Sequence, residues 1–124
     1  MANQPLKGSA RLIAAWRNSV AGFRDIWRGE EAFRLEIWAL AAAVPTAIWL
    51  GRDVFETALL IAAVLFIVII EVLNSAIEAT IDRIGPERHE LSRQAKDLGS
   101  LAVLLATILA GVLWVAALWM KFTG

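Results

Sequence analysis

Three long apolar stretches set the hydrophobic pattern of this chain. The run from Leu101 to Met120 is uncharged and, at about 20 residues, is long enough to cross a bilayer as a helix. The run from Thr57 to Ile70 continues past Glu71 without a turn signal until Gly85-Pro86. The stretch at 37–50 is shorter, and flanking side chains that snorkel to the interface extend it. The pattern predicts an all-α membrane protein with spanning helices at residues 33–50, 54–84 and 92–121.

The N-terminal segment predicts an amphipathic helix over residues 10–28, ahead of the first span. Apolar side chains recur there every three or four residues and form one face: Leu12, Trp16, Val20, Phe23 and Trp27. Another face carries Arg17, Arg24 and Arg28. Aromatic residues opposite arginines are typical of a helix in the membrane interface. A soluble amphipathic helix has the same pattern, but the spanning segment that follows directly favours the interface.

Small residues and a capping residue indicate how the spans pack and begin. Alanines spaced by four form a stripe in the first span and another in the third: Ala39, Ala43 and Ala47, then Ala102, Ala106 and Ala110. Such stripes let helices approach closely in lipid. Ser92 is expected to cap the third spanning helix, because its hydroxyl can accept a bond from a free backbone N–H.

Basic residues are unevenly distributed and predict the orientation of the chain. They gather in the N-terminal segment and around the loop at 85–92: Lys7, Arg11, Arg17, Arg24, Arg28, Arg34, Arg83, Arg88, Arg93 and Lys96. The opposite ends of the spans offer only Arg52 and Lys121. Because basic residues favour the cytoplasmic side, we expect a cytoplasmic N-terminus and a periplasmic C-terminus.

Composition narrows the possible chemistry. Hydrophobic residues make up 59% of the 124 residues, more than a soluble domain of this size could bury, so we expect a single membrane domain over residues 1–124. The formal net charge is zero, which gives no sign of a nucleic-acid partner. The chain has no cysteine and a single histidine, His89, which excludes thiol chemistry and a multi-histidine zinc site. Ser75 and Ser100 have no histidine near them in the sequence with which to form a serine–histidine triad. A P-loop motif is absent as well.

Three acidic residues follow one line of the second span where it leaves the membrane. At about 100° per residue, Glu71, Glu78 and Asp82 fall within about 40° of one another, and we call them the acidic ridge. Glu71 lies about 25 Å along the helix from Val54, near the inner interface. Carboxylates this close repel one another, and a bound Mg²⁺ would relieve the repulsion. The alternative is a solvated helix end with salt bridges to Arg34, Arg83 or Arg93.

Two more polar clusters belong to the same membrane depth. One lies where the surface helix joins the first span: Glu30, Glu31, Arg34 and Glu36. The other lies at the start of the third span: Lys96, Asp97 and Ser100. Ionisable groups from three segments at one depth indicate an active site more readily than an architectural role.

The motifs E-x-x-N-S-A-x-E-x-x-x-D at 71–82 and A-K-D at 95–97 resemble those of the bacterial integral-membrane diacylglycerol kinase family, and the similarity covers residues 10–122. The resemblance implies a homotrimer in the inner membrane, with active sites shared between neighbouring subunits. It also implies transfer of the γ-phosphoryl group of MgATP to the hydroxyl of diacylglycerol. The products would be phosphatidic acid and ADP, and the role would be phospholipid recycling.

The resemblance further implies roles for individual positions. Glu71 takes the position of the catalytic base, Asn74 lies beside it and orients it, and Glu30 and Glu78 take the positions that hold Mg²⁺. The ATP-binding positions fall at Arg11, Asn18, Glu30, Glu78, Glu87, Arg88, His89, Lys96 and Asp97. The positions that bind the lipid fall at Arg11, Ala15, Ser19, Ala32, Phe33, Glu36, Glu71 and Ser100. The chemistry agrees, because an alcohol is a poor nucleophile until a carboxylate accepts its proton.

Two other functions stay open on the sequence alone. A kinase of the same fold that acts on undecaprenol would share the base, the metal ligands and the topology, so the catalytic motifs do not separate the two lipids. A small transporter would also carry ionisable residues in its spans. A transporter should place a binding group near the membrane midplane, whereas the charges here lie at one interface and the midplane is apolar.

Overall fold

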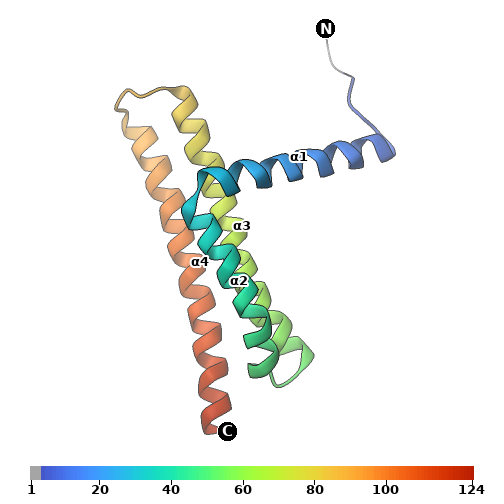
Figure 1. Cartoon of the computed structure of the whole chain (residues 1–124). Helices are drawn as coiled ribbons and strands as arrows, with labels where there is room; N and C mark the ends of the chain where they lie inside the picture. Colours follow the sequence, from blue (N-terminus) through green and yellow to red (C-terminus); the bar gives the residue numbers. More distant parts are fainter. Residues whose placement is uncertain (1–3) are drawn as a thin grey trace. The chain divides into compact units, whose positions relative to one another are not determined.

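The computed structural model describes residues 4–124, most of which are helical. Figure 1 labels four helices: α1 at Gly8–Gly29, α2 at Glu31–Leu50, α3 at Val54–Ile84 and α4 at Glu90–Thr123. By length and composition α2, α3 and α4 are each able to cross a membrane. The expected all-α fold with three candidate spans is therefore confirmed. The chain divides into two units between Glu31 and Ala32.

The first unit consists of α1 and its flanking residues. Large apolar side chains such as Leu12 and Trp16 are exposed along this helix, and none of its residues is buried. Phe23 stacks on Trp27 one turn further on, with ring centroids 5.8 Å apart. An exposed apolar face of this kind is what an interfacial helix offers to lipid.

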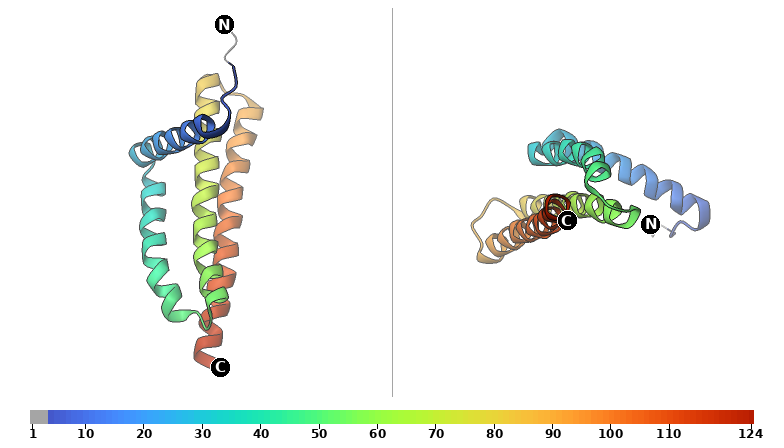
Figure 2. Two further views of the ribbon diagram at one scale, coloured as in Figure 1. Left: turned by 90° about the vertical axis from the view of Figure 1, so that its right-hand side faces the viewer. Right: turned by 90° about the horizontal axis from the view of Figure 1, so that it is seen from below.

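In the second unit α3 and α4 pack side by side along their lengths, as both views in Figure 2 show. Small residues of α4 form the contact, which we call the α4 seam: Gly99, Ala106, Ala110 and Ala117 are buried at spacings of seven, four and seven. These spacings keep the four residues on one face, and their small size lets the two backbones come close. The alanine stripe expected here is buried at two of its positions and half-buried at Ala102.

The helix α2 meets this pair at the end that carries the 51–53 turn. Ala47 and Leu50 of α2 join Leu60 of α3 and Ala117 of α4 in one buried cluster. Of the alanine stripe expected in this helix, Ala47 is fully buried, its neighbour one turn earlier is also buried, and the first of the three is exposed. Three helices therefore share a core at this end of the unit.

Polar contacts reinforce the same end. The indole Nε1 of Trp114 donates a hydrogen bond to the carbonyl oxygen of Leu60 at 3.1 Å. Lys121 Nζ donates to the carbonyl oxygen of Trp49 at 3.2 Å and lies 4.3 Å from the centroid of the Trp49 ring. The cation over an aromatic face adds an electrostatic attraction to the hydrogen bond.

The loop at 85–89 separates α3 from α4 at the other end of the pair. Gly85 ends α3 with a φ of +151°, a conformation that glycine adopts and other residues disfavour. The cap of α4 is His89, whose Nδ1 accepts a hydrogen bond from the backbone N–H of Leu91 at 3.1 Å. The expectation that Ser92 caps this helix is wrong, because α4 begins earlier, at Glu90, and Ser92 lies within its first turn.

Candidate active site

The acidic ridge begins at Glu71, whose side chain points into the second unit instead of toward solvent. Only 7% of its surface is exposed, and it is the one buried charged residue among residues 4–124. Its carboxyl group lies against that of Glu36, which α2 contributes. Glu36 Oε2 is buried without a hydrogen-bond partner. Two carboxyl groups in contact repel unless they share a proton or meet a cation, so this pair is suited to proton transfer.

One turn further along α3, Asn74 and Glu78 form the second polar contact of the ridge. Asn74 Nδ2 donates a hydrogen bond to Glu78 Oε1 at 3.4 Å. Both side chains are half-buried, and Asn74 Oδ1 is buried without a hydrogen-bond partner. Ser75 Oγ beside it is also buried and unpartnered. Unsatisfied buried oxygens cost free energy, so this part of α3 favours a ligand that donates to them or a cation that binds them.

The ridge ends at Asp82, which pairs with α4. Lys96 Nζ lies 3.2 Å from Asp82 Oδ1, and both side chains are largely exposed. The ion-pair partner of Asp82 is therefore Lys96 of α4. An exposed ion pair contributes little stability, so its main effect is to hold the ammonium group of Lys96 beside the ridge.

Arg93 organises the charges at the start of α4. It forms an ion pair with Glu90 and a second one with Asp97, whose Oδ2 lies 2.7 Å from Arg93 Nη1. Asp97, expected to contact the nucleotide, is thus engaged by an arginine of its own helix.

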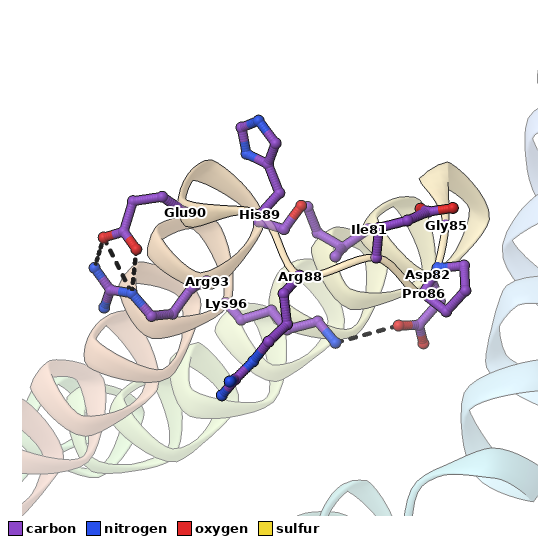
Figure 3. Close-up of a pocket in the computed structure, with 11 residues that line it drawn as sticks. Ile81, Asp82, Gly85, Pro86, Arg88, His89, Glu90, Arg93 and Lys96 are labelled. Carbon is purple, nitrogen blue, oxygen red and sulfur yellow. Dashed lines mark hydrogen bonds and ion pairs between the residues drawn. The ribbon is translucent and has the colours of Figure 1, made fainter.

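An open cavity of about 610 Å³ lies between the end of α3, the 85–89 loop and the start of α4. Four of the residues expected to bind ATP line it: Glu87, Arg88, His89 and Lys96. Figure 3 shows the Arg88 and Lys96 side chains on the same side of the loop, whereas the His89 ring points to the opposite side. The Arg88 and Lys96 cations give this side of the cavity the charge that phosphate groups require.

The other expected residues of the second unit lie near the start of α2 and along α4. Ala32 is exposed and Phe33 is almost fully buried, with 2% of its surface accessible. Ser100 is exposed on α4, next to the buried Gly99.

The first unit carries the remaining expected residues. Arg11, Ala15, Asn18 and Ser19 are all exposed on α1, and their spacing places them on one face of that helix. Ser19 Oγ donates a hydrogen bond to the Ala15 carbonyl oxygen at 2.8 Å, so its hydroxyl proton is already engaged. Glu30 is half-buried and forms the C-cap of α1, where its backbone N–H donates to the Ile26 carbonyl oxygen.

The oxygen atoms of the ridge fit a metal ion that takes its other ligands from a nucleotide. Among residues 4–124 no group of three acidic or histidine side chains gathers closely enough to hold a metal by itself. Mg²⁺ characteristically binds one or two protein carboxylates and completes its shell with phosphate oxygens and water. Glu78, with the unpartnered amide oxygen of Asn74 on the same helix, supplies hard donors of this type.

Two features of the site were missing from the residues expected to form it. Arg93 and Ser92 also line the cavity, and the charges spaced by three and four at Glu90, Arg93 and Asp97 could have indicated the ion-pair network. Gly99 lies against Asn74. A glycine inside a helical pattern was the available signal, because such a glycine weakens the helix and so calls for a packing or functional reason.

Comparisons with known proteins point to one activity. Residues 17–118 match the prokaryotic diacylglycerol kinase family. The chain is 50% identical to the diacylglycerol kinase of Escherichia coli (strain K12) over 115 residues, which cover 93% of this chain and 94% of the relative. It is 43% identical to the diacylglycerol kinase of Pseudomonas aeruginosa over 121 residues, 95% and 98% of the two chains. The diacylglycerol kinase of Helicobacter pylori (strain 26695) is 35% identical over 118 residues, 93% and 92% of the two chains.

Proposed function

The chain belongs to the prokaryotic diacylglycerol kinase family, and we propose that it carries out its reaction at the acidic ridge, with Glu71 as the general base. The enzyme is an ATP-dependent lipid kinase that phosphorylates the hydroxyl of diacylglycerol to phosphatidic acid. The family resemblance expected from the motifs is thereby confirmed. The relatives are diacylglycerol kinases, so the undecaprenol alternative gains no support from them. In a phosphoryl-transfer enzyme the ridge serves catalysis, so the ridge no longer favours the transporter hypothesis.

The observation that carries the proposal is the burial of Glu71 in contact with Glu36. A buried carboxylate on a spanning helix can meet a lipid hydroxyl at the interface while the acyl tails stay in the membrane. As the alcohol attacks the γ-phosphorus, Glu71 accepts its proton. Glu36, which touches it from α2, holds the base in place and can share that proton.

We place the nucleotide in the cavity between α3 and α4. Lys96 and Arg88 neutralise phosphate charge there, and the Asp82 contact keeps Lys96 extended along the ridge. Glu87 and His89 also line this cavity, and Asp97 follows Lys96 on α4. The family resemblance also assigns nucleotide binding to Arg11 and Asn18, which share one face of α1 in the first unit.

Glu78 and Glu30 would hold Mg²⁺ on the phosphates, and the ion would supply charge neutralisation during the transfer. Their carboxylates are the hard ligands that Mg²⁺ prefers. Asn74 lies one turn after Glu71 and one turn before Glu78, and its amide donates a hydrogen bond to the Glu78 carboxylate. It is therefore the residue that orients the carboxylates of the ridge. The lipid is bound by the residues around the base: Arg11, Ala15, Ser19, Ala32, Phe33, Glu36 and Ser100.

The assembly that we propose is a homotrimer in the bacterial inner membrane, with active sites shared between subunits. The extensive exposure of apolar side chains on α2, α3 and α4 supports both lipid contact and contact between subunits. The excess of basic residues at the N-terminal segment and at the 85–89 loop supports a cytoplasmic position for both. ATP would then reach the ridge directly from the cytoplasm.

The test of this proposal is Glu71→Gln. The amide keeps the shape of the side chain but cannot take a proton from the alcohol, so we expect turnover to fall by about 10²- to 10⁴-fold. The assay measures ATP-dependent phosphorylation of a short-chain diacylglycerol by the purified protein.

The matched control is Glu56→Gln, on the same helix at the other end of the unit, where Glu56 pairs with Arg52. This variant should keep wild-type turnover. If Glu71→Gln also stayed near wild-type turnover while remaining folded, Glu71 would lose the role of base.

A further inference from the structure

Gly99 of α4 lies directly against the side chain of Asn74 in α3. A methyl group at Gly99 would overlap Asn74 Oδ1, and it would lie only 3.3 Å from Asn74 Cγ. Gly99 itself is buried. Gly111 lies about 18 Å further along the same helix, at 1.5 Å per residue. It has nothing within 4 Å of the corresponding position. Gly99 therefore has a close neighbour that Gly111, on the same helix, does not have.

The contact of Gly99 differs in kind from the rest of the α4 seam. Ala106, Ala110 and Ala117 are buried in the same seam as alanines, so close helix packing along it does not by itself require a glycine. Glycine is less favourable than alanine inside a helix. At Gly99 the atom nearest to the missing side chain is the amide oxygen of Asn74, and Ile77 Cδ1 lies further away, at 3.8 Å. The missing side chain leaves room for the amide of Asn74.

The position of that amide matters because it is bonded along the ridge. Asn74 Nδ2 donates to Glu78 Oε1 at 3.4 Å, and the other end of the amide is the oxygen that occupies the space beside Gly99. A side chain at Gly99 would push this oxygen away. The rotation would carry Nδ2 away from Glu78, because the two ends of a planar amide move together.

We propose that Gly99 is a positioning residue for the phosphoryl transfer: its bare backbone lets Asn74 hold the Glu78 carboxylate in its working orientation. The inference rests on the proposed function, in which Glu78 binds Mg²⁺ on the nucleotide. The same stretch of α4 carries Lys96 and Asp97, so a single packing contact aligns the nucleotide-binding residues of α4 with the ridge of α3.

The first test is Gly99→Ala, with Gly111→Ala as the matched control on the same helix. We expect Gly99→Ala to lower kcat on the order of 10²-fold, as small displacements of catalytic groups do, and to raise the Mg²⁺ concentration required for half-maximal rate. Its KM for diacylglycerol should stay unchanged. Gly111→Ala should keep wild-type kcat and Mg²⁺ dependence and should raise the Tm, because alanine favours the helix.

The second test measures stability and does not depend on activity. In an Asn74→Ala background the space beside Gly99 is empty, so Gly99→Ala should no longer lower the Tm there, although it lowers the Tm of the otherwise wild-type protein. An equal loss of Tm in both backgrounds would show that Gly99 serves helix packing alone and would overturn the proposal. So would wild-type kcat and Mg²⁺ dependence in Gly99→Ala. Glu71→Gln, assayed alongside, reports separately on the proposed function.

Discussion

At the level of single residues, four side-chain oxygens among residues 4–124 are buried without a hydrogen-bond partner, and three of them lie near the acidic ridge, whereas the fourth, Glu56 Oε1, lies at the other end of α3. Glu36 Oε2, Asn74 Oδ1 and Ser75 Oγ are all buried without hydrogen-bond partners. Buried polar atoms are normally paired, and unpaired ones tend to mark sites where a ligand completes the bonding. The three atoms lie on residues within or beside the contacts of Glu71 and Glu78, so the ridge is built to receive polar groups that the chain does not itself provide.

Glu78→Gln tests the assignment of this carboxylate to the metal. The amide retains one oxygen but loses the negative charge, so Mg²⁺ binding should weaken by at least the roughly 10- to 100-fold that loss of an outer-shell partner causes. We expect a lower rate and a shift of the Mg²⁺ titration to higher concentration, measured at saturating ATP and lipid. An unchanged Mg²⁺ titration would count against Glu78 as a ligand.

Residue types were predictable from the sequence, but their pairings were not. The motif at 71–82 was sufficient to nominate Glu71, Asn74 and Glu78. The contact between Glu71 and Glu36 depends on how α2 approaches α3, and helical periodicity within one element carries no information about that. Likewise Gly99 matters because the side chain of Asn74 occupies the space beside it, and Asn74 lies 25 positions earlier in the chain.

At the level of helices, α3 and α4 form the closely packed pair of the second unit. The seam of small residues runs from Gly99 beside the ridge to Ala117 in the core at the other end. Close backbone approach gains dispersion contacts, which drive helix association in a membrane where lipid tails already satisfy apolar side chains. The seam therefore both stabilises the pair and sets the distance across which Lys96 reaches Asp82.

Ala106→Leu should separate the two helices. The added side chain has no room at a position with 3% of its surface exposed, so we expect a loss of about 1–3 kcal/mol in the free energy of unfolding. Ala116→Leu, at an exposed position of the same helix, is the control and should be close to neutral. Thermal unfolding in detergent, followed by circular dichroism, compares the two. Equal stability of both variants would show that the seam does not carry the packing.

The helices could be predicted from the apolar runs, because a membrane span depends on its length and on internally satisfied backbone hydrogen bonds more than on particular packing partners. The residue at which α4 begins could not be predicted in this way. Ser92 is a good capping residue, yet a ring nitrogen of His89 reaches the free N–H of Leu91 first and lets the helix begin at Glu90. Capping propensities hold on average, but the first residue of α4 depends on the local backbone geometry after Gly85.

At the level of the whole molecule, the residues that we propose for catalysis and binding are divided between the two units of the chain. The base, the cavity and Glu78 belong to the second unit, whereas Glu30, Arg11 and Asn18 belong to the first. A cyclic trimer can supply the two sets from different subunits, because a rotation axis repeats each contact around the ring. Large exposed apolar surfaces on the spans are consistent with such an arrangement.

Mixing two inactive variants tests the shared site. The Glu30→Gln and Glu71→Gln variants should each be inactive alone. In the test, the two variants are unfolded together and reassembled in equal amounts. If the Glu30 and Glu71 of one site come from different subunits, a site is intact whenever its two contributing subunits both carry the needed carboxylate, and about a quarter of wild-type activity should return. Each variant reassembled with itself is the control. Activity that stays at the level of the single variants would place both carboxylates of a site on the same subunit, and the shared arrangement would have to be given up.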